Sequence, residues 1–329
     1  MSFTHLFVSI NLLVAGTSAL PATTYALQDT YDYTNWLSRF SVQNLLYLTL
    51  SRNNSHICVD GFVNYVTQAQ AQSEGLLKTI GDQVYIGVDN TTQLDPNGSV
   101  GRNSVRLQSN PSYNHALVIA DFAHIPVSDC GVWPAFWMVG PNWPNEGEID
   151  IIEGVNLNTY DQVTLHTSSG CVPTIGSGGQ TGTPTGNADC GAGGGYTGCG
   201  VVSGSATSYG TAFNANGGGV YATLWTSSAI KVWYFPANGV PSDIKSGTPN
   251  PAGWGTPIAN YAGCGFDAHF QNMNIIFDTT FCGDWAGQVW SSSSCASLNP
   301  SCNAYVAEEP QSFGNAYWLV NSIKVYSMS

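Results

Sequence analysis

The sequence predicts an all-β protein, a β-jelly-roll sandwich built from two antiparallel sheets. Short runs of β-branched and aromatic residues recur along the chain, Gly, Pro, Asn and Ser separate them at turn spacing, and long helical periodicity is scarce. A series of such strands buries its apolar faces when two sheets pack against each other. The predicted strands alternate or cluster their apolar side chains and lie, in order, at residues 84–88, 104–108, 116–121, 163–167, 230–235, 274–278 and 320–326.

The length of 329 residues allows one large domain or two ordinary ones. Apolar residues make 43% of the chain, enough to fill a sizeable core. Residues 176–200 hold eleven glycines and almost no large apolar side chain, which is typical of a linker or of a surface loop. Because Cys190 and Cys199 interrupt this segment, we favour a disulfide-stapled loop. We therefore expect a single domain over residues 20–329.

The charge balance excludes several classes of partner. Eight Lys and Arg stand against 21 Asp and Glu, giving a net charge of −13. Eight scattered cations cannot form the basic surface that nucleic acid requires. The same acidity disfavours anionic membranes and polyanionic substrates. A neutral substrate is the expected ligand.

The N-terminus and the cysteines predict secretion. Residues 6–16 are apolar but too short to span a membrane comfortably, and small residues follow at 17–19. We interpret residues 1–19 as a signal peptide, the alternative being an ordinary buried helix or strand. No later run resembles a membrane helix.

Nine cysteines follow that segment, and their spacing offers no CxxC pair of a zinc site, nor do the histidines form HExxH. In a secreted chain this predicts four disulfides, one unpaired thiol and no metal. Glycosylation sequons at Asn53, Asn90 and Asn97 fit the same compartment.

A cluster of carboxylates is the strongest chemical feature. Three of the six glutamates, Glu146, Glu148 and Glu153, fall within eight residues, with Asp150 among them. Side chains alternate along a strand, so a regular strand would turn residue 153 away from residues 148 and 150. One extra residue, a β-bulge at 151–152, restores the phase and avoids burying an unpaired carboxylate.

Converging carboxylates suit glycoside hydrolysis, where one acid attacks the anomeric carbon and another protonates the leaving oxygen. A solvated acidic face and a Ca²⁺ site are the alternatives. Aromatic residues just upstream, on which sugar rings stack, favour hydrolysis. We interpret Trp133 as a core residue, and Glu146, beyond Gly147, as a residue at the rim of the site.

Residues 143–156, WPNEGEIDIIEGVN, resemble the active-site strand of glycoside hydrolase family 16, most closely that of fungal laminarinase-type endo-β-1,3(4)-glucanases. Further segments resemble the same subgroup, and these lie at residues 61–66, 101–106, 164–167, 213–219, 231–235, 241–244 and 280–287. The resemblance implies a curved jelly roll with an open cleft on its concave face, a retaining mechanism and no cofactor.

The resemblance also implies roles for particular residues. Glu148 would be the nucleophile, Glu153 the general acid/base and Asp150 a helper hydrogen-bonded near the nucleophile, with His166 beside these carboxylates. The family's sugar-stacking tryptophans match Trp137, Trp143 and Trp285, and its hydrogen-bond donors in the cleft match Asn64 and Arg102. The implied partner is a β-glucan such as laminarin, lichenan or cell-wall glucan, bound by a monomer.

One segment departs from the family pattern. Residues 41–59 are longer and more apolar than the corresponding link in the family, and they contain Cys58, our candidate for the unpaired thiol. Two other functions remain open. A wall-remodelling transglycosylase uses the same acids, whereas a non-catalytic β-glucan-binding relative typically lacks them.

Overall fold

A computed structural model describes residues 23–44 and 61–329. The expected signal peptide, the sequon at Asn53 and most of the atypical segment 41–59, including Cys58, lie outside the described residues.

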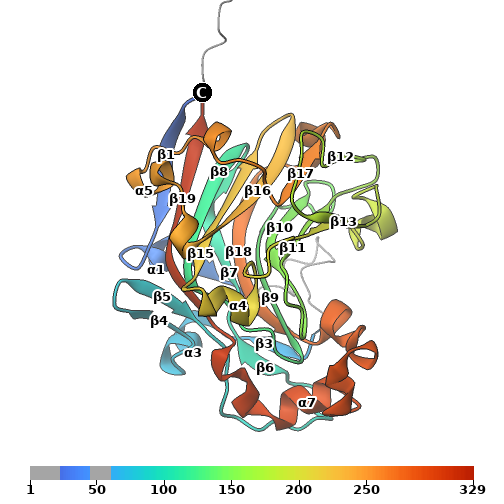
Figure 1. Ribbon diagram of the computed structural model, residues 1–329. Coiled ribbons are helices and arrows are strands. Elements are labelled where there is room, and N and C mark those ends of the chain that lie inside the picture. Colours follow the sequence, from blue (N-terminus) through green and yellow to red (C-terminus); the bar gives the residue numbers. More distant parts are fainter. Residues whose placement is uncertain (1–22, 45–60) are drawn as a thin grey trace, which may run out of the picture.

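Two large antiparallel sheets form the body of the molecule (Figure 1). The larger sheet has nine strands. Eight of them are neighbours in the order β12 (Thr174–Ile175), β17 (Ala259–Ala262), β16 (Ala229–Pro236), β15 (Gly219–Trp225), β8 (Ala116–His124), β19 (Trp318–Met328), β5 (Gln83–Ile86) and β4 (Leu77–Ile80). The ninth, β1 (Tyr25–Tyr31), pairs with β19. The first strand therefore lies beside the last one.

The second sheet has eight strands and carries the carboxylate cluster near its middle. Its order is β13 (Thr183–Gly186), β14 (Cys199–Val202), β11 (Gln162–His166), β10 (Glu148–Glu153), β9 (Val132–Val139), β18 (Met273–Phe281), β7 (Leu107–Tyr113) and β2 (Phe40–Val42). The predicted sandwich of two antiparallel sheets is confirmed.

Smaller elements join the strands. A parallel pair is formed by β3 (Val63–Tyr65) and β6 (Arg102–Ser104). The α-helices are α1 (Trp36–Arg39), α3 (Gln68–Ser73), α4 (Gly210–Ala215), α5 (Ser242–Ser246), α6 (Phe266–His269) and α7 (Cys302–Glu308). Short stretches of 3₁₀ helix lie at Ala192–Gly195, Ala237–Gly239, Pro251–Gly253, Trp290–Ser292, Ser294–Ser297 and Pro310–Asn315, and η4 (Gly283–Gly287) is a turn of π-helix. Within residues 23–44 and 61–329, no helix has the length and apolar character needed to cross a bilayer.

The main core lies between the two sheets and follows from the alternation of each strand. Val118 and Ala120 of β8 face Phe136 and Met138 of β9 within one buried cluster. Residues at the intervening positions of β9, such as Trp137, turn to the opposite side. We call this side of the eight-stranded sheet, facing away from the core, the site face.

Six of the seven predicted strands are confirmed, and one is divided. The expected strand at 104–108 is split between β6 and β7, with Val105 and Arg106 between them. Arg106 is almost completely buried and its Nη1 lies 2.6 Å from Oδ2 of Asp278 on β18. A buried guanidinium needs such a partner, and the alternation of side chains along a strand does not reveal it.

Four disulfides tie the loops to the sheets, as predicted. They join Cys130 to Cys295, Cys171 to Cys264, Cys190 to Cys199 and Cys282 to Cys302. The glycine-rich segment is therefore stapled, although it also contributes β13 and β14, which pair with each other and continue the sheet beyond β11.

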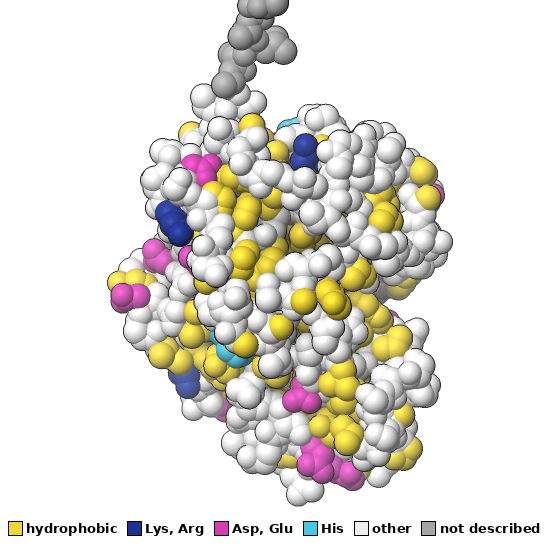
Figure 2. All heavy atoms as spheres, viewed as in Figure 1, with side chains coloured by type: hydrophobic (Ala, Val, Ile, Leu, Met, Phe, Trp, Pro, Cys, Tyr) yellow, Lys and Arg dark blue, Asp and Glu magenta, His cyan; other side chains and the backbone are white. Residues whose placement is uncertain are grey.

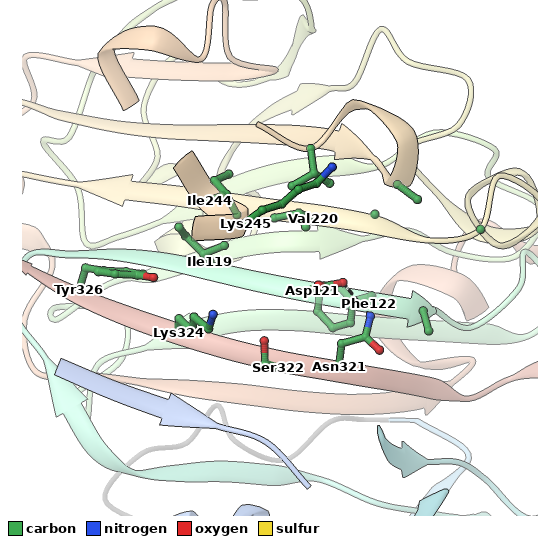
Figure 3. Close-up of a pocket in the computed structure, with 15 residues that line it drawn as sticks. Ile119, Asp121, Phe122, Val220, Ile244, Lys245, Asn321, Ser322, Lys324 and Tyr326 are labelled. Atoms are coloured by element: carbon green, nitrogen blue, oxygen red, sulfur yellow. Dashed lines mark hydrogen bonds between the residues drawn. The ribbon is translucent and has the colours of Figure 1, made fainter. Parts of the chain in front are cut away.

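The nine-stranded sheet carries a hollow on its outer face. Charged side chains are sparse on the face seen in Figure 2. A pocket of about 430 Å³ lies between α5 and β8, β15 and β19 (Figure 3), and its polar lining includes Asp121, Asn321, Lys245 and Lys324. This pocket lies on the nine-stranded sheet, whereas the carboxylate cluster lies on the eight-stranded one.

Candidate active site

The main chain of β10 contains the bulge that the sequence predicted. Asp150 pairs with Trp137 of β9, but Ile152 pairs with the adjacent Phe136, so Ile151 is the extra residue. Ile151 and Ile152 are both completely buried. After the bulge, Glu153 pairs with Ala135, which lies two residues from Trp137 on β9 and therefore on the same face of the sheet. All three acids therefore share the site face.

Strand register places His166 beside these acids. On β11, His166 lies opposite Glu148 and Thr164 lies opposite Asp150. Nε2 of His166 is 3.1 Å from Oδ2 of Asp150, and Nδ1 is 2.7 Å from the carbonyl oxygen of Gly195 in the glycine-rich loop. Both acceptors face ring nitrogens, so an imidazolium that donates to each satisfies the geometry.

The charge of His166 follows from these contacts. Burial of the ring opposes its protonation, but the hydrogen bond to Asp150 and the nearby carboxylates outweigh it and raise the pKa of His166 to about 10. The expectation that His166 lies among the carboxylates agrees with this geometry, and His166 supplies a fixed positive charge to them.

Glu153 is held by an indole that sequence reasoning assigned to the core. Nε1 of Trp133 donates to Oε1 of Glu153 at 2.8 Å, and Trp133 is only half-buried. The core interpretation of Trp133 was therefore wrong. Its position four residues before Trp137 on one strand was the available signal, because both must then share a face.

The two glutamates have raised pKa values for the same reasons. Burial and then the charge of Asp150 raise the pKa of Glu148, while His166 and Arg106 oppose the shift. Burial and then Asp150 also raise the pKa of Glu153, while His166 and the indole of Trp133 oppose the shift. A raised pKa suits a general acid, which must keep a proton that it can donate.

Trp137 stands over an ion pair that the sequence did not reveal. Its ring centroid is 4.8 Å from the guanidinium carbon of Arg106, which pairs with Asp278. Burial raises the pKa of Asp278 to about 6, against the effect of Arg106. No spacing rule predicts this pair, because it joins the segment before β7 to the middle of β18.

Aromatic rings flank the acids at both ends of β10. Before β10, the ring centroid of Trp143 lies 5.3 Å from that of Tyr196, whose side chain is 60% exposed on the glycine-rich loop. Beyond Glu153, Trp285 lies in η4 with its ring edge-on to Trp133, at 5.9 Å between centroids. Tyr196 was not anticipated, since an aromatic residue in a glycine-rich run carries no periodic signal.

One of the two donors expected in the cleft, Arg102, lies elsewhere, and the placement of Asn64 leaves its predicted role as a prediction. Arg102 is completely buried, and its guanidinium donates to the carbonyl oxygens of Val306, Asp89 and Thr92. It therefore anchors α7 and cannot reach a sugar in this conformation, which corrects the prediction. Asn64 is half-buried on β3 and its amide donates to Oδ1 of Asn103 at 2.7 Å.

Glu148, Asp150 and His166 offer ligand atoms that all lie within 4.8 Å of one another. That spacing would suit a metal ion, but a ligating imidazole must give up a proton and use a lone pair. In His166 one nitrogen faces the carbonyl of Gly195 and the other faces Asp150. The arrangement therefore fits a cationic partner of the acids better than a metal centre.

Comparison with known proteins agrees with this fold. The model of the XgeA-like catalytic domain of glycoside hydrolase family 16 matches residues 53–326. A probable endo-1,3(4)-β-glucanase of Aspergillus niger is 45% identical over 99% of this chain and 43% of its own length. The chain belongs to glycoside hydrolase family 16. It spans less than half the length of that relative.

Two solved structures are similar over nearly the whole chain. An elongating family 16 β-1,3-glucosyltransferase is 43% identical with a TM-score of 0.83, over 92% of this chain and all of its own. Laminarinase 16A from Phanerochaete chrysosporium, solved with two β-glucans in its donor and acceptor sites, is 42% identical with a TM-score of 0.82, over 93% of this chain and all of its own.

Replacing Trp133 with phenylalanine is expected to shift the alkaline limb of the pH–rate profile upward. The indole N–H stabilises the ionised form of Glu153, so its loss raises the pKa of Glu153 further and keeps the acid protonated to higher pH. A hydrogen bond to a charged group contributes about 1.5 kcal/mol or more, or roughly one pH unit. Trp290→Phe is the control, because that indole donates to Asn299 instead. Equal shifts in both variants would contradict the assignment.

Proposed function

We propose that this protein hydrolyses internal β-1,3 bonds, and mixed β-1,3/1,4 bonds, of glucans with retention of configuration. The observation that carries this proposal is the bulge in β10, which puts Glu148, Asp150 and Glu153 on one face. The names of the relatives support the same activity. A neutral polymer also suits a chain with a net charge of −13.

The mechanism has two displacements. In the first, an oxygen of Glu148 bonds to the anomeric carbon as the glycosidic C–O bond breaks, and Glu153 gives its proton to the departing oxygen. In the second, Glu153 takes a proton from water, the water oxygen bonds to the anomeric carbon, and the ester to Glu148 breaks. His166 pairs with Asp150, and its positive charge favours the ionised form of Glu148, which the charge of Asp150 opposes.

The substrate would lie along the site face between the flanking aromatic rings. The rings of Trp143 and Tyr196 pack together at the end of β10 that begins with Glu148. The rings of Trp133 and Trp285 pack together at the end that carries Glu153. Sugar rings stack on such surfaces, so the glucosyl units on either side of the cleaved bond have a platform each.

The direct test is a reducing-sugar assay on laminarin and lichenan, with product sizing and with cellulose as the control of β-1,4 bonds alone. We expect rapid release of short oligosaccharides from laminarin and lichenan. Absence of any release from both would refute the proposal.

A second candidate function is glucosyl transfer, favoured by the 43% identity to an elongating β-1,3-glucosyltransferase. The same covalent intermediate would then pass to a sugar hydroxyl instead of water. Sizing distinguishes the two, because transfer yields products longer than a supplied laminari-oligosaccharide. A non-catalytic role in glucan binding is disfavoured by the presence of both Glu148 and Glu153.

Secretion as a monomer belongs to the same proposal. Four disulfides among the described cysteines are typical of proteins that fold in an oxidising compartment. A polymer outside the cell is accessible only to such a protein.

A further inference from the structure

One buried carboxyl group has no part in the mechanism above. Asp161 directly precedes β11, and its side chain is completely inaccessible to solvent. Its Oδ1 accepts the main-chain N–H of Glu153 at 3.0 Å. Burying a carboxyl is costly unless its contacts compensate, so this contact calls for an explanation.

The reason lies in the bulge. Residue pairs between β10 and β11 run from Glu148 opposite His166 to Asp150 opposite Thr164, and end there. Beyond the bulge, the N–H of Glu153 faces a buried region without a main-chain partner in that ladder. A buried N–H needs an acceptor, and Asp161 supplies one from its side chain.

Asp161 is itself held firmly on two sides. Its carbonyl oxygen accepts the N–H of Ser203 at 2.8 Å, and its N–H donates to Oγ of Ser208 at 3.3 Å. Next to Glu153, Gly154 packs so closely on Tyr209 that a Cβ there would lie 2.7 Å from the ring. The main chain around Glu153 is therefore fixed from both directions.

We propose that Asp161 is a positioning residue for Glu153: its carboxyl oxygen fixes the main chain just after the bulge and so aims the acid at the leaving oxygen. The inference rests on the proposed function, in which Glu153 is the general acid/base. Asp161 acts through Glu153 and does not touch the substrate.

The proposed role of Asp161 requires an acceptor oxygen at this place and not a charge. Burial and the charge of Asp150 raise the pKa of Asp161, while hydrogen bonds from Tyr221 and from the main-chain N–H groups of Glu153 and Gln162 oppose the shift. The hydroxyls of Tyr209 and Tyr261 also lie near its carboxyl group. An amide oxygen in the same place would serve equally well. An asparagine at position 161 therefore distinguishes a hydrogen-bond acceptor from a residue that acts through its negative charge.

The test compares Asp161→Asn, Asp161→Leu and Asp161→Ala on two aryl β-laminaribiosides. One carries phenol, which departs only with a proton from the acid, and the other carries 2,4-dinitrophenol, which needs none. General acid–base catalysis contributes about 10²–10⁴-fold, so partial misalignment should remove about 10-fold or more on the phenyl glycoside. On the dinitrophenyl glycoside the Leu and Ala variants should stay within about twofold in the glycosylation step. The conservative Asp161→Asn variant should hydrolyse both substrates at the rates of the parent protein.

Equal losses on the two substrates, or none, in the Leu or Ala variant would overturn the proposal. So would a selective loss in the Asn variant, which decides the matter even if the other two fail to fold. Glu153→Ala is measured alongside: if it shows no selective loss on the phenyl glycoside, the proposed function fails, whatever the Asp161 variants do.

Discussion

Alanine in place of Glu148 is expected to lower the rate of laminarin hydrolysis by at least ~10³-fold, because the covalent intermediate can no longer form. The structure gives the reason for so large an effect. Glu148 lies opposite His166 of β11, and its carboxyl group interacts electrostatically with Asp150, His166 and Arg106. Azide supplied with an activated substrate should enter the space left by the carboxylate. It attacks once, so the product is the α-glycosyl azide.

Glu146→Ala is the matched control for this prediction. Glu146 lies two residues earlier, in the turn before β10, where its main chain binds Asn142 and Gln271. Its replacement should leave the rate within a few-fold of the parent. Full activity in Glu148→Ala, or an equal loss in Glu146→Ala, would contradict the assignment of the nucleophile.

Alanine in place of Glu153 is expected to remove about 10²–10⁴-fold from hydrolysis of substrates with poor leaving groups. Substrates with good leaving groups should form the glycosyl-enzyme rapidly but release it slowly, because no base activates water. Azide needs no base, so it should restore turnover and give the β-glycosyl azide after two displacements. Product configuration by NMR therefore separates the two glutamates: an α-azide from this variant would reverse their roles.

The strand pattern was predictable wherever it arose from alternation within one segment. The bulge in β10 followed from parity alone, because a regular strand would have buried Glu153 among the isoleucines. The same parity, applied to β9, would also have placed Trp133 on the site face. It was assigned to the core because a single tryptophan is more often buried than functional.

Contacts between distant segments could not be predicted in this way. Arg102 and Arg106 lie four residues apart, yet Arg102 donates to a carbonyl oxygen of α7, whereas Arg106 lies over the ring of Trp137 and pairs with Asp278. Sequence spacing carries no information on which buried acceptor each guanidinium meets. The acceptor role of Asp161 was hidden for the same reason, since it appears only once the bulge breaks the ladder.

The most direct measurement is the trapping of the glycosyl-enzyme with a 2-deoxy-2-fluoro-laminaribioside that carries a good leaving group. The fluorine slows the second displacement, so the label stays on the nucleophile. No Lys or Arg lies between Arg106 and Lys231, so trypsin does not cut near the two glutamates. Digestion with pepsin followed by tandem mass spectrometry would therefore locate the labelled residue. The account predicts a single label on Glu148. A label on Glu153, or inactivation without any covalent adduct, would contradict the claim that the bulged strand directs these two acids to one glucosidic bond.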